Sequence, residues 1–230
     1  MAVTKFQPIL FQILAYVYER DLVIYSDGHA VFISTAIMMK FSRAQTPLHL
    51  IKDTVGVEVG VDQGEFSKIL LEKSPKKLYL VDAWKTIGGT DRTTGADQST
   101  HESKYKSVSE MFRNEPRVEI IRSWSEEASL NFEDGSLDWV YIDARHDYTG
   151  VMSDLRAWSK KIKSTGFIWG DDYRTPDMKH KPRVDVRRAV ADFTKETNWQ
   201  LVGLTTEEKR SKSFFLAKHK EVIDRFKSLV

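Results

Sequence analysis

Acidic residues close two short apolar segments of this chain, and their placement points to chemistry. One segment runs from Leu137 to Asp143 and the other from Gly166 to Asp172, with 28 positions from Asp143 to Asp171. A helical pattern lies between them, so the two segments predict a β-α-β unit with parallel strands about 5 Å apart. The carboxylates would then meet at one edge of the sheet and repel one another unless a cation or a proton neutralises them. That edge is where open α/β sheets bind ligands.

A second group of residues has the spacing of a nucleotide-type site. Gly60 and Gly64 follow the apolar segment 55–61 in a G-x-x-x-G pattern, with Glu58 just before it. Asp82 closes the next apolar segment, 22 positions after Gly60, where an acid can accept hydrogen bonds from ribose hydroxyls. The pattern differs from the dinucleotide pattern G-x-G-x-x-G and lacks the lysine of a P-loop, which disfavours a nicotinamide oxidoreductase.

Composition excludes several classes of protein. The 230 residues include 35 Lys and Arg against 33 Asp and Glu, and this balance gives no indication of nucleic-acid binding. There are no cysteines, so disulfides and thiolate metal sites are excluded. No small-residue cleavage site of a signal peptide follows the apolar stretch 8–18. Asp27 and His29 interrupt the stretch 22–39, which is therefore not a continuous apolar run that could span a membrane. We therefore expect a soluble, cytoplasmic protein without a membrane partner.

The elements that must position these residues alternate along the chain from residue 54. The alternation predicts an α/β, Rossmann-like, doubly wound sheet of seven mostly parallel strands, with helices on both faces. Strands are expected at 55–61, 77–81, 118–121, 137–143, 166–170, 199–204 and 213–217. Only a polar turn separates the last two, which predicts one antiparallel edge strand. We assign residues 51–230 to this domain.

Residues 1–50 are expected to form an N-terminal helical extension. Phe6, Leu10, Ile13 and Val17 follow the spacing of one buried helical stripe. The extension would cap the sheet or contribute to a homo-oligomer.

Two further segments have open interpretations. Residues 85–103 contain three glycines, five threonines and few large apolar residues, which fits either a lid over the sheet edge or a surface loop. The basic run from Lys179 to Arg183, with Arg187 and Arg188 beyond it, fits either an anion-binding patch or a solvated face.

Taken in order, these motifs resemble a known family. The pattern from Glu58 to Gly64, with Asp82 and Asp143 closing later strands, is similar to class I S-adenosylmethionine-dependent methyltransferases. The segments 141–148, 154–158 and 170–172 resemble more specifically a branch of small-molecule O-methyltransferases. That branch includes the macrolide-sugar enzymes and, more distantly, catechol O-methyltransferase. The resemblance covers residues 54–218.

The resemblance implies a cofactor and a metal ion. It places S-adenosylmethionine with its methionine part on Glu58 and Gly60, its ribose on Asp82, and its adenine near Trp124 and Ser125. Val61, Gly64 and Trp84 complete the expected cofactor site, although Trp84, like Tyr173, could instead border the substrate or pack in the core. The resemblance also implies Mg²⁺ or Mn²⁺ held by Asp143, Asp171 and Asp172.

Methyl transfer needs an oxygen nucleophile in line with the methyl group, together with a means of deprotonating it. His146 is the candidate base and, with Asp143, a candidate catalytic residue, because the pKa of histidine is ordinarily near 6.5. His146 could instead make a structural hydrogen bond, and the paired acids could cap a helix or pair with Arg145 or Arg174.

Three functions follow. The favoured one is metal-dependent O-methylation of a small hydroxylated molecule, for which a sugar is one candidate. The alternatives are a metal-independent methyltransferase and a non-catalytic cofactor-binding assembly protein.

Overall fold

A computed structural model describes residues 22–24, 30–32, 37–38, 48–86, 97–173, 185–205 and 212–227. The chain divides into two compact units, Met1–Ala36 and Ile37–Val230. In the first unit, β1 (Leu22–Ile24) pairs antiparallel with β2 (Ala30–Phe32).

The interpretation of residues 1–50 as helical is therefore wrong at residues 22–24, 30–32 and 37–38, which form strands, whereas Leu48–Ile51 is helical. Branched and aromatic side chains such as those of Val23, Ile24 and Phe32 favour strands. Residues 37–50, which we had assigned to the extension, belong to the larger unit. The stripe of Phe6, Leu10, Ile13 and Val17 lies outside the described residues.

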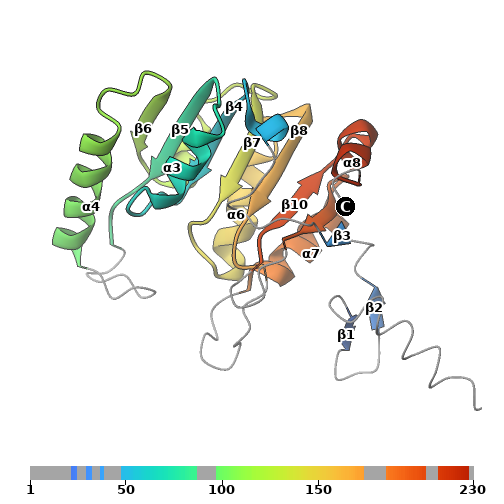
Figure 1. Cartoon of the computed structure of the whole chain (residues 1–230). Helices are drawn as coiled ribbons and strands as arrows, with labels where there is room; N and C mark the ends of the chain where they lie inside the picture. The colour runs from blue at the N-terminus through green and yellow to red at the C-terminus, as the bar shows by residue number, and fades with distance from the viewer. Residues whose placement is uncertain are drawn as a thin grey trace, which may run out of the picture. The chain divides into compact units, whose positions relative to one another are not determined.

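Strands and helices alternate through the larger unit (Figure 1). Its strands are β3 (Ile37–Met38), β4 (Val55–Val59), β5 (Lys77–Asp82), β6 (Val118–Arg122), β7 (Leu137–Ile142), β8 (Ile162–Gly170), β9 (Gln200–Leu204) and β10 (Phe214–Ala217). Its helices are α2 (Leu48–Ile51), α3 (Glu65–Glu72), α4 (Gln98–Met111), α5 (Ser125–Ser129), α6 (Tyr148–Trp158), α7 (Val186–Glu196) and α8 (Lys220–Lys227).

The sheet confirms the expected fold class. Its strand order is β3-β9-β10-β8-β7-β4-β5-β6, in which the two-residue β3 adds to seven longer strands. Strands β8, β7, β4, β5 and β6 pair in parallel, so their carboxyl ends share one edge. Among the described strands of this sheet, β10 alone runs antiparallel to its neighbours; it lies between β8 and β9, with β9 on its outer side.

One face of the sheet carries a continuous aromatic layer. Tyr141 and Trp169 project from β7 and β8 with ring centroids 4.7 Å apart, and α3 adds Phe66, 4.5 Å from Tyr141. On the same face, Phe215 of the neighbouring strand β10 stacks on Trp169 and contacts Phe226 of α8. Because side chains alternate along a strand, the residues between these belong to the opposite face.

The opposite face is covered by α5, α6 and α7. Tyr79 of β5 contacts Phe132 edge to face at 4.9 Å, and Phe132 in turn packs against Trp158 of α6. Arg188 of α7 stacks over Tyr148 of α6 at 4.5 Å. Helices on both faces make this a doubly wound sheet. In such sheets, ligands bind at the edge formed by the carboxyl ends of the parallel strands.

Asp138, one of the acids in the first segment, has a structural role. Its carboxylate accepts a hydrogen bond from the Val55 N–H at 2.8 Å and pairs with Lys163 at 2.7 Å. It therefore joins β7 to the start of β4 and to β8, at the end of the sheet away from the site.

The segment 85–103 is partly helical. Asp97 caps α4 by accepting a hydrogen bond from the Thr100 N–H at 2.8 Å, so residues 98–103 form the first turns of α4. An acceptor at this position satisfies a free N–H of the first turn and favours helix. Residues 87–96 lie outside the described part, so the lid stays a prediction.

Among the residues that the structure describes, no helix combines the length and the apolar character needed to cross a bilayer.

Two tryptophans in the aromatic layer provide a matched test of this core. Both Trp139 and Trp169 are 0% exposed. The Trp139 Nε1–H donates to Thr54 Oγ1 at 2.8 Å, whereas among the described residues Trp169 Nε1 has no partner. We expect Trp139→Phe to lower the free energy of unfolding by about 1–3 kcal/mol more than Trp169→Phe, because only the former breaks a buried hydrogen bond. Urea unfolding of both variants measures this difference, and equal losses would contradict it.

Candidate active site

The turn after β4 lies against the end of β7. Gly60 has φ 90°, and a side chain there would place a Cβ atom 2.2 Å from the carbonyl oxygen of Asp143. The Asp143 N–H donates to Val59 O at 2.8 Å, so the two strand ends are joined directly. Only glycine allows this approach. Gly60, one of the residues of the predicted methionine site, therefore lies beside Asp143. Both are at the edge of the sheet formed by the carboxyl ends of the parallel strands.

Glu58, the acid that opens the motif, is buried. It is 1% exposed and accepts a hydrogen bond from the hydroxyl of Ser67 on α3. A buried polar group costs free energy unless it has such a hydrogen-bond partner. Glu58 therefore links β4 to the helix that follows it.

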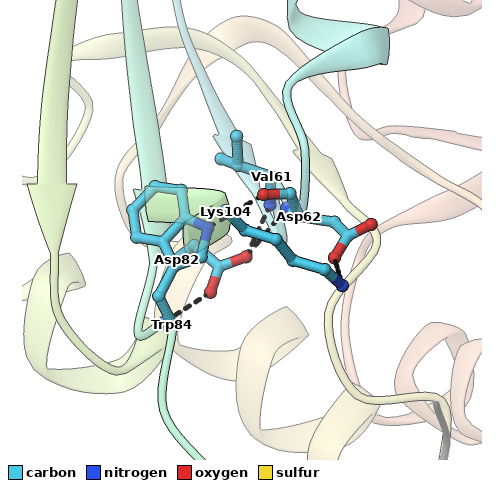
Figure 2. Close-up of polar contacts among 5 residues, drawn as sticks. All are labelled: Val61, Asp62, Asp82, Trp84 and Lys104. Carbon is cyan, nitrogen blue, oxygen red and sulfur yellow. Dashed lines mark hydrogen bonds and ion pairs between the residues drawn. The ribbon is translucent and has the colours of Figure 1, made fainter. Parts of the chain in front are cut away.

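Asp82 binds backbone N–H groups of two segments at the sheet edge, the turn after β4 and the residues after β5. Its Oδ2 accepts from the N–H groups of Val61 and Asp62, at 2.9 and 3.0 Å, and its Oδ1 accepts from the Trp84 N–H at 2.7 Å (Figure 2). A carboxylate has about four acceptor sites, so the three hydrogen bonds from described residues leave about one for the ribose hydroxyl expected there. Asp82 therefore holds the turn in place as well as facing the ligand edge.

Trp84 packs in the core, which is one of the interpretations that the sequence left open. The side chain is 1% exposed and its ring lies 5.2 Å from that of Tyr105. Its Nε1–H donates to the carbonyl of Asp62 at 2.9 Å. The backbone φ of 42° is rare for a bulky residue, and it turns the indole back under the strand end. Tyr173 is likewise in the core, at 2% exposure.

An open cavity lies beyond the ends of β5 and β6. Its volume is about 510 Å³, and it is lined by Ala83, Lys85, Gln98, Arg122, Ser123, Trp124 and Glu127. Trp124, one of the two residues expected near the adenine, is in this lining. The amide of Gln98 bonds the Trp84 carbonyl and the Thr86 N–H, at 3.0 and 3.2 Å, which attaches α4 to the rim.

Ser125, the other residue expected near the adenine, is engaged below the cavity. Its hydroxyl accepts a hydrogen bond from Trp158 Nε1 at 2.9 Å and also bonds the carboxyl group of Asp154. Burial raises the pKa of Asp154 to about 7, against opposition from the Ser125 hydrogen bond. The charge of Glu126 adds to the rise, Arg145 opposes it and Asp147 adds a smaller contribution.

The acids at the ends of β7 and β8 meet around an imidazole. His146 Nε2 lies 3.1 Å from Asp143 Oδ1, and His146 Nδ1 lies 3.2 Å from Asp172 Oδ2. One ligand atom from each of the three residues lies within 4.8 Å of the others. We call Asp143, His146 and Asp172 the acid–histidine cluster. Asp172 has φ 57°, a strained conformation of the kind found at functional sites.

The protonation of His146 is governed by these neighbours. Burial lowers the pKa of His146, but the hydrogen bond and charge of Asp143 and the charges of Asp172 and Asp171 outweigh burial and raise it overall. With both ring nitrogens facing carboxylates, the protonated ring can donate to each. The cluster is therefore arranged to hold positive charge between two acids.

Asp171 stands apart from the three residues of the cluster, although it was expected among the ligands. Its Oδ1 accepts a hydrogen bond at 3.1 Å from the hydroxyl of Ser213, which directly precedes β10. Asp171 and Asp172 are adjacent, and adjacent side chains at a strand end point in different directions. Arg145 pairs with Asp147 at 3.4 Å, so it is engaged beside the cluster.

Several residues that line or hold the site were not predicted from the sequence. They are Ser67, Gln98, Lys104, Arg122 and Glu127. Ser67 lies nine positions after Glu58, on the helix that a βα unit places beside the motif, so its spacing was a usable signal. The others come from α4, from the last position of β6 or from α5, and nothing in their local sequence marks them.

The arrangement of strands, turn and cavity defines a Rossmann-like α/β fold with its ligand edge at the carboxyl ends of the parallel strands. Residues 57–173 match the family described as the methyltransferase domain. The chain belongs to this methyltransferase family, which supports S-adenosylmethionine as its cofactor.

Solved structures agree with the fold at low sequence identity. A Clostridium thermocellum protein described as a putative rRNA methylase has a TM-score of 0.56 and 10% identity, covering 80% of this chain and 100% of its own. A Corynebacterium glutamicum protein has a TM-score of 0.54 and 12% identity, with 94% and 92% coverage. Aeropyrum pernix fibrillarin, solved with S-adenosyl-L-methionine, has a TM-score of 0.53 and 10% identity, with 73% and 68% coverage. No curated protein matches the chain.

The buried carboxyl of Asp154 gives a pH-dependent prediction. Its pKa is about 7 in the folded protein and ordinarily 3.8, so the folded state binds this proton more tightly. The contribution of Asp154 to stability is therefore highest at low pH and is lost as the pH rises from about 4 to 7. Asp154→Asn removes this loss, so it should raise the free energy of unfolding at pH 8, relative to its effect at pH 4, by up to about 4 kcal/mol. Urea unfolding at both pH values tests it; a variant effect that does not change with pH would count against the assignment.

Proposed function

We propose that this methyltransferase transfers a methyl group from S-adenosylmethionine to a hydroxyl oxygen of a small molecule, with a divalent cation at the acid–histidine cluster. The observation that carries the proposal is the contact between Gly60 and Asp143. It places the turn expected to hold the methionine part of the cofactor next to the cluster, where an acceptor hydroxyl would bind.

The proposed cofactor site follows the edge of the sheet in the order β7, β4, β5, β6. Glu58, Gly60, Val61 and Gly64 would form the methionine end, and Asp82 would accept from the ribose. Trp124 and the cavity of about 510 Å³ would receive the adenine. Ser125 would act from beneath through its bonds to Trp158 and Asp154. Trp84 would support this site by holding the carbonyl of Asp62.

The donor set of the cluster fits a hard cation. Two carboxylates supply oxygen ligands of the kind that Mg²⁺ and Mn²⁺ prefer, and Mg²⁺ usually retains several waters as well. Asp143 is 26% and Asp172 is 17% exposed, so water and a substrate can reach them. Asp143 and Asp172 are the proposed ligands, and Asp171 stays a predicted ligand that would have to leave Ser213. A bound cation would orient an acceptor hydroxyl and lower its pKa.

His146 is the proposed base. In its neutral form it would accept the proton of the acceptor hydroxyl at Nδ1, which requires that Asp172 binds the cation instead of the ring, while Asp143 orients the ring through the contact at 3.1 Å. The oxygen would then attack the methyl group bound at the neighbouring turn, and the bond from the methyl carbon to sulfur would break to release S-adenosylhomocysteine. The protein's contribution would be mainly alignment.

A metal-independent methyltransferase is the second candidate. The two nitrogens of His146 already lie at hydrogen-bond distance from both carboxylates, so a protonated ring can balance the charge of the cluster without a cation.

The partners remain part of the proposal. A formal net charge of +2 supports a small acceptor rather than a nucleic acid. Homo-oligomer formation through residues 1–50 and a cytoplasmic location are retained as proposals. The anion-binding role of the basic run is retained too, although Arg188 is engaged with Tyr148.

The cofactor assignment is tested by calorimetry with S-adenosylmethionine, S-adenosylhomocysteine and NAD⁺. We expect the two adenosyl ligands to bind and NAD⁺ not to bind. Asp82→Ala should weaken adenosyl binding by about 1.5–3 kcal/mol, because it removes an ionised acceptor. Asp134→Ala, which breaks an exposed ion pair with Lys161 away from the site, is the control. Binding of NAD⁺ alone would overturn the assignment.

The metal assignment is tested first by binding. Calorimetric titration with Mn²⁺ in the presence of S-adenosylhomocysteine should show one site, which Asp143→Asn or Asp172→Asn abolishes. Asp171→Asn tests whether Asp171 is a ligand as well, since its side chain accepts a hydrogen bond from Ser213.

Activity then separates the two candidates. With labelled S-adenosylmethionine and a panel of hydroxylated sugars and phenols, turnover should vanish in chelator and return with Mg²⁺. Asp172→Asn should lower kcat by about 10²–10³, the scale of losing a main electrostatic stabiliser, with little change in cofactor affinity. Full turnover in chelator would replace the metal-dependent proposal with the metal-independent one.

A further inference from the structure

The turn that faces the cofactor has an unusual backbone. Gly60, Asp62 and Gly64 have φ values of 90°, 51° and 77°, so three of five consecutive residues are left-handed. Glycine adopts this conformation freely, whereas it costs a residue with a side chain roughly 1–2 kcal/mol, a cost that aspartate can reduce with local hydrogen bonds. The turn therefore needs contacts that hold Asp62 in place.

Every polar group of Asp62 has a partner from another element. Its N–H donates to Asp82 and its carbonyl accepts from Trp84 Nε1, and both of these residues lie at the end of β5. Its carboxylate pairs with the ammonium of Lys104, which comes from α4 (Figure 2). The two sides of the turn are thus held by two different elements.

Lys104 lies in the interface between α4 and the turn. Its side chain is only 15% exposed, which is low for a lysine. Beside it, α4 packs close to Gly64: a Cβ atom there would lie 3.3 Å from Val108 Cγ2 and 3.4 Å from Phe112 Cε2. The apolar contacts bring the helix to the turn, and Lys104 directs its charge at Asp62.

Stability alone does not account for this pair. The Asp62 side chain is 59% exposed, and ion pairs with an exposed partner contribute little to folding. Their geometric effect is separate from that contribution, because the pair determines where the Asp62 carboxylate and the attached backbone lie. The backbone N–H groups of Val61 and Asp62 also orient the carboxylate of Asp82.

We propose that Lys104 is a positioning residue for S-adenosylmethionine, which acts by holding Asp62 and thereby keeping the turn 60–64 and the carboxylate of Asp82 in the form that binds the cofactor. The proposal rests on the proposed cofactor site. It assigns Lys104 no contact with the reacting atoms.

The experiment compares Lys104→Met, Lys104→Arg, Asp62→Asn and the double variant. The dissociation constant of S-adenosylhomocysteine, measured by calorimetry, should rise about tenfold in Lys104→Met and in Asp62→Asn. Lys104→Arg keeps the charge and should restore binding to within about threefold. The double variant should bind no more weakly than either single one, because both remove the same contact.

Two controls separate positioning from folding. Lys68→Met breaks an exposed ion pair with Glu65 on α3 and should leave the dissociation constant unchanged. The urea midpoint of Lys104→Met should stay close to that of the unaltered protein. Amide hydrogen exchange in the free protein should speed up at residues 61 and 62 in Lys104→Met but not in Lys104→Arg.

The outcomes are distinct. If the unaltered protein binds S-adenosylhomocysteine and Lys104→Met binds it equally well, the positioning role is wrong. If Lys104→Met weakens binding and Lys104→Arg or Asp62→Asn does not follow the expected pattern, the effect does not pass through Asp62 and the proposal is also wrong. If the unaltered protein binds neither adenosyl ligand, the cofactor site fails, and the exchange measurement still reports whether Lys104 holds the turn.

Discussion

The carboxylate of Asp82 is the contact on which the site depends. It gathers three backbone N–H groups from two separate segments, the turn after β4 and the residues after β5. An ionised acceptor makes such bonds stronger than neutral ones, so a short side chain can hold two loops that would otherwise be independent. The left-handed residues at Gly60, Asp62 and Trp84 are sustained around it. The same carboxylate lies at the ligand edge, so the proposed contact with the cofactor and the geometry of the loops depend on one group.

Charge balance organises the other half of the edge. Asp143 and Asp172 come from neighbouring strands, and His146 lies between them with a raised pKa. A proton on the ring and a metal ion are two ways of meeting the same electrostatic demand. Because Gly60 brings the turn onto Asp143, a change in this balance occurs beside the expected methyl donor rather than at a distance from it.

The sequence predicted the sheet and the strand-end acids well, because apolar periodicity and chain order determine which ends share an edge. It did not predict which acids converge. Asp171 and Asp172 look alike in sequence, yet the left-handed φ of Asp172 directs one toward His146 while the other bonds Ser213. The sequence also left the place of Trp84 open between the core and a ligand, since its left-handed backbone conformation has no sequence signal. Lys104 lies 42 positions from Asp62, and only the packing of α4 joins them. In residues 1–50, the strands β1 and β2 were not predicted because three residues are too few to show a strand periodicity.

The position of β10 has a consequence for how the chain is synthesised. This strand follows all the others in sequence, yet it lies between β8 and β9 and pairs with both. Until residues 214–217 have left the ribosome, β8 and β9 each present an unpaired edge, and open edges of apolar strands invite association with other chains. The half of the sheet that carries Asp143 and Asp172 is thus flanked by an incomplete region during translation, whereas β4, β5 and β6 can pair earlier. Chaperone demand during synthesis should accordingly concentrate on the later half of the chain.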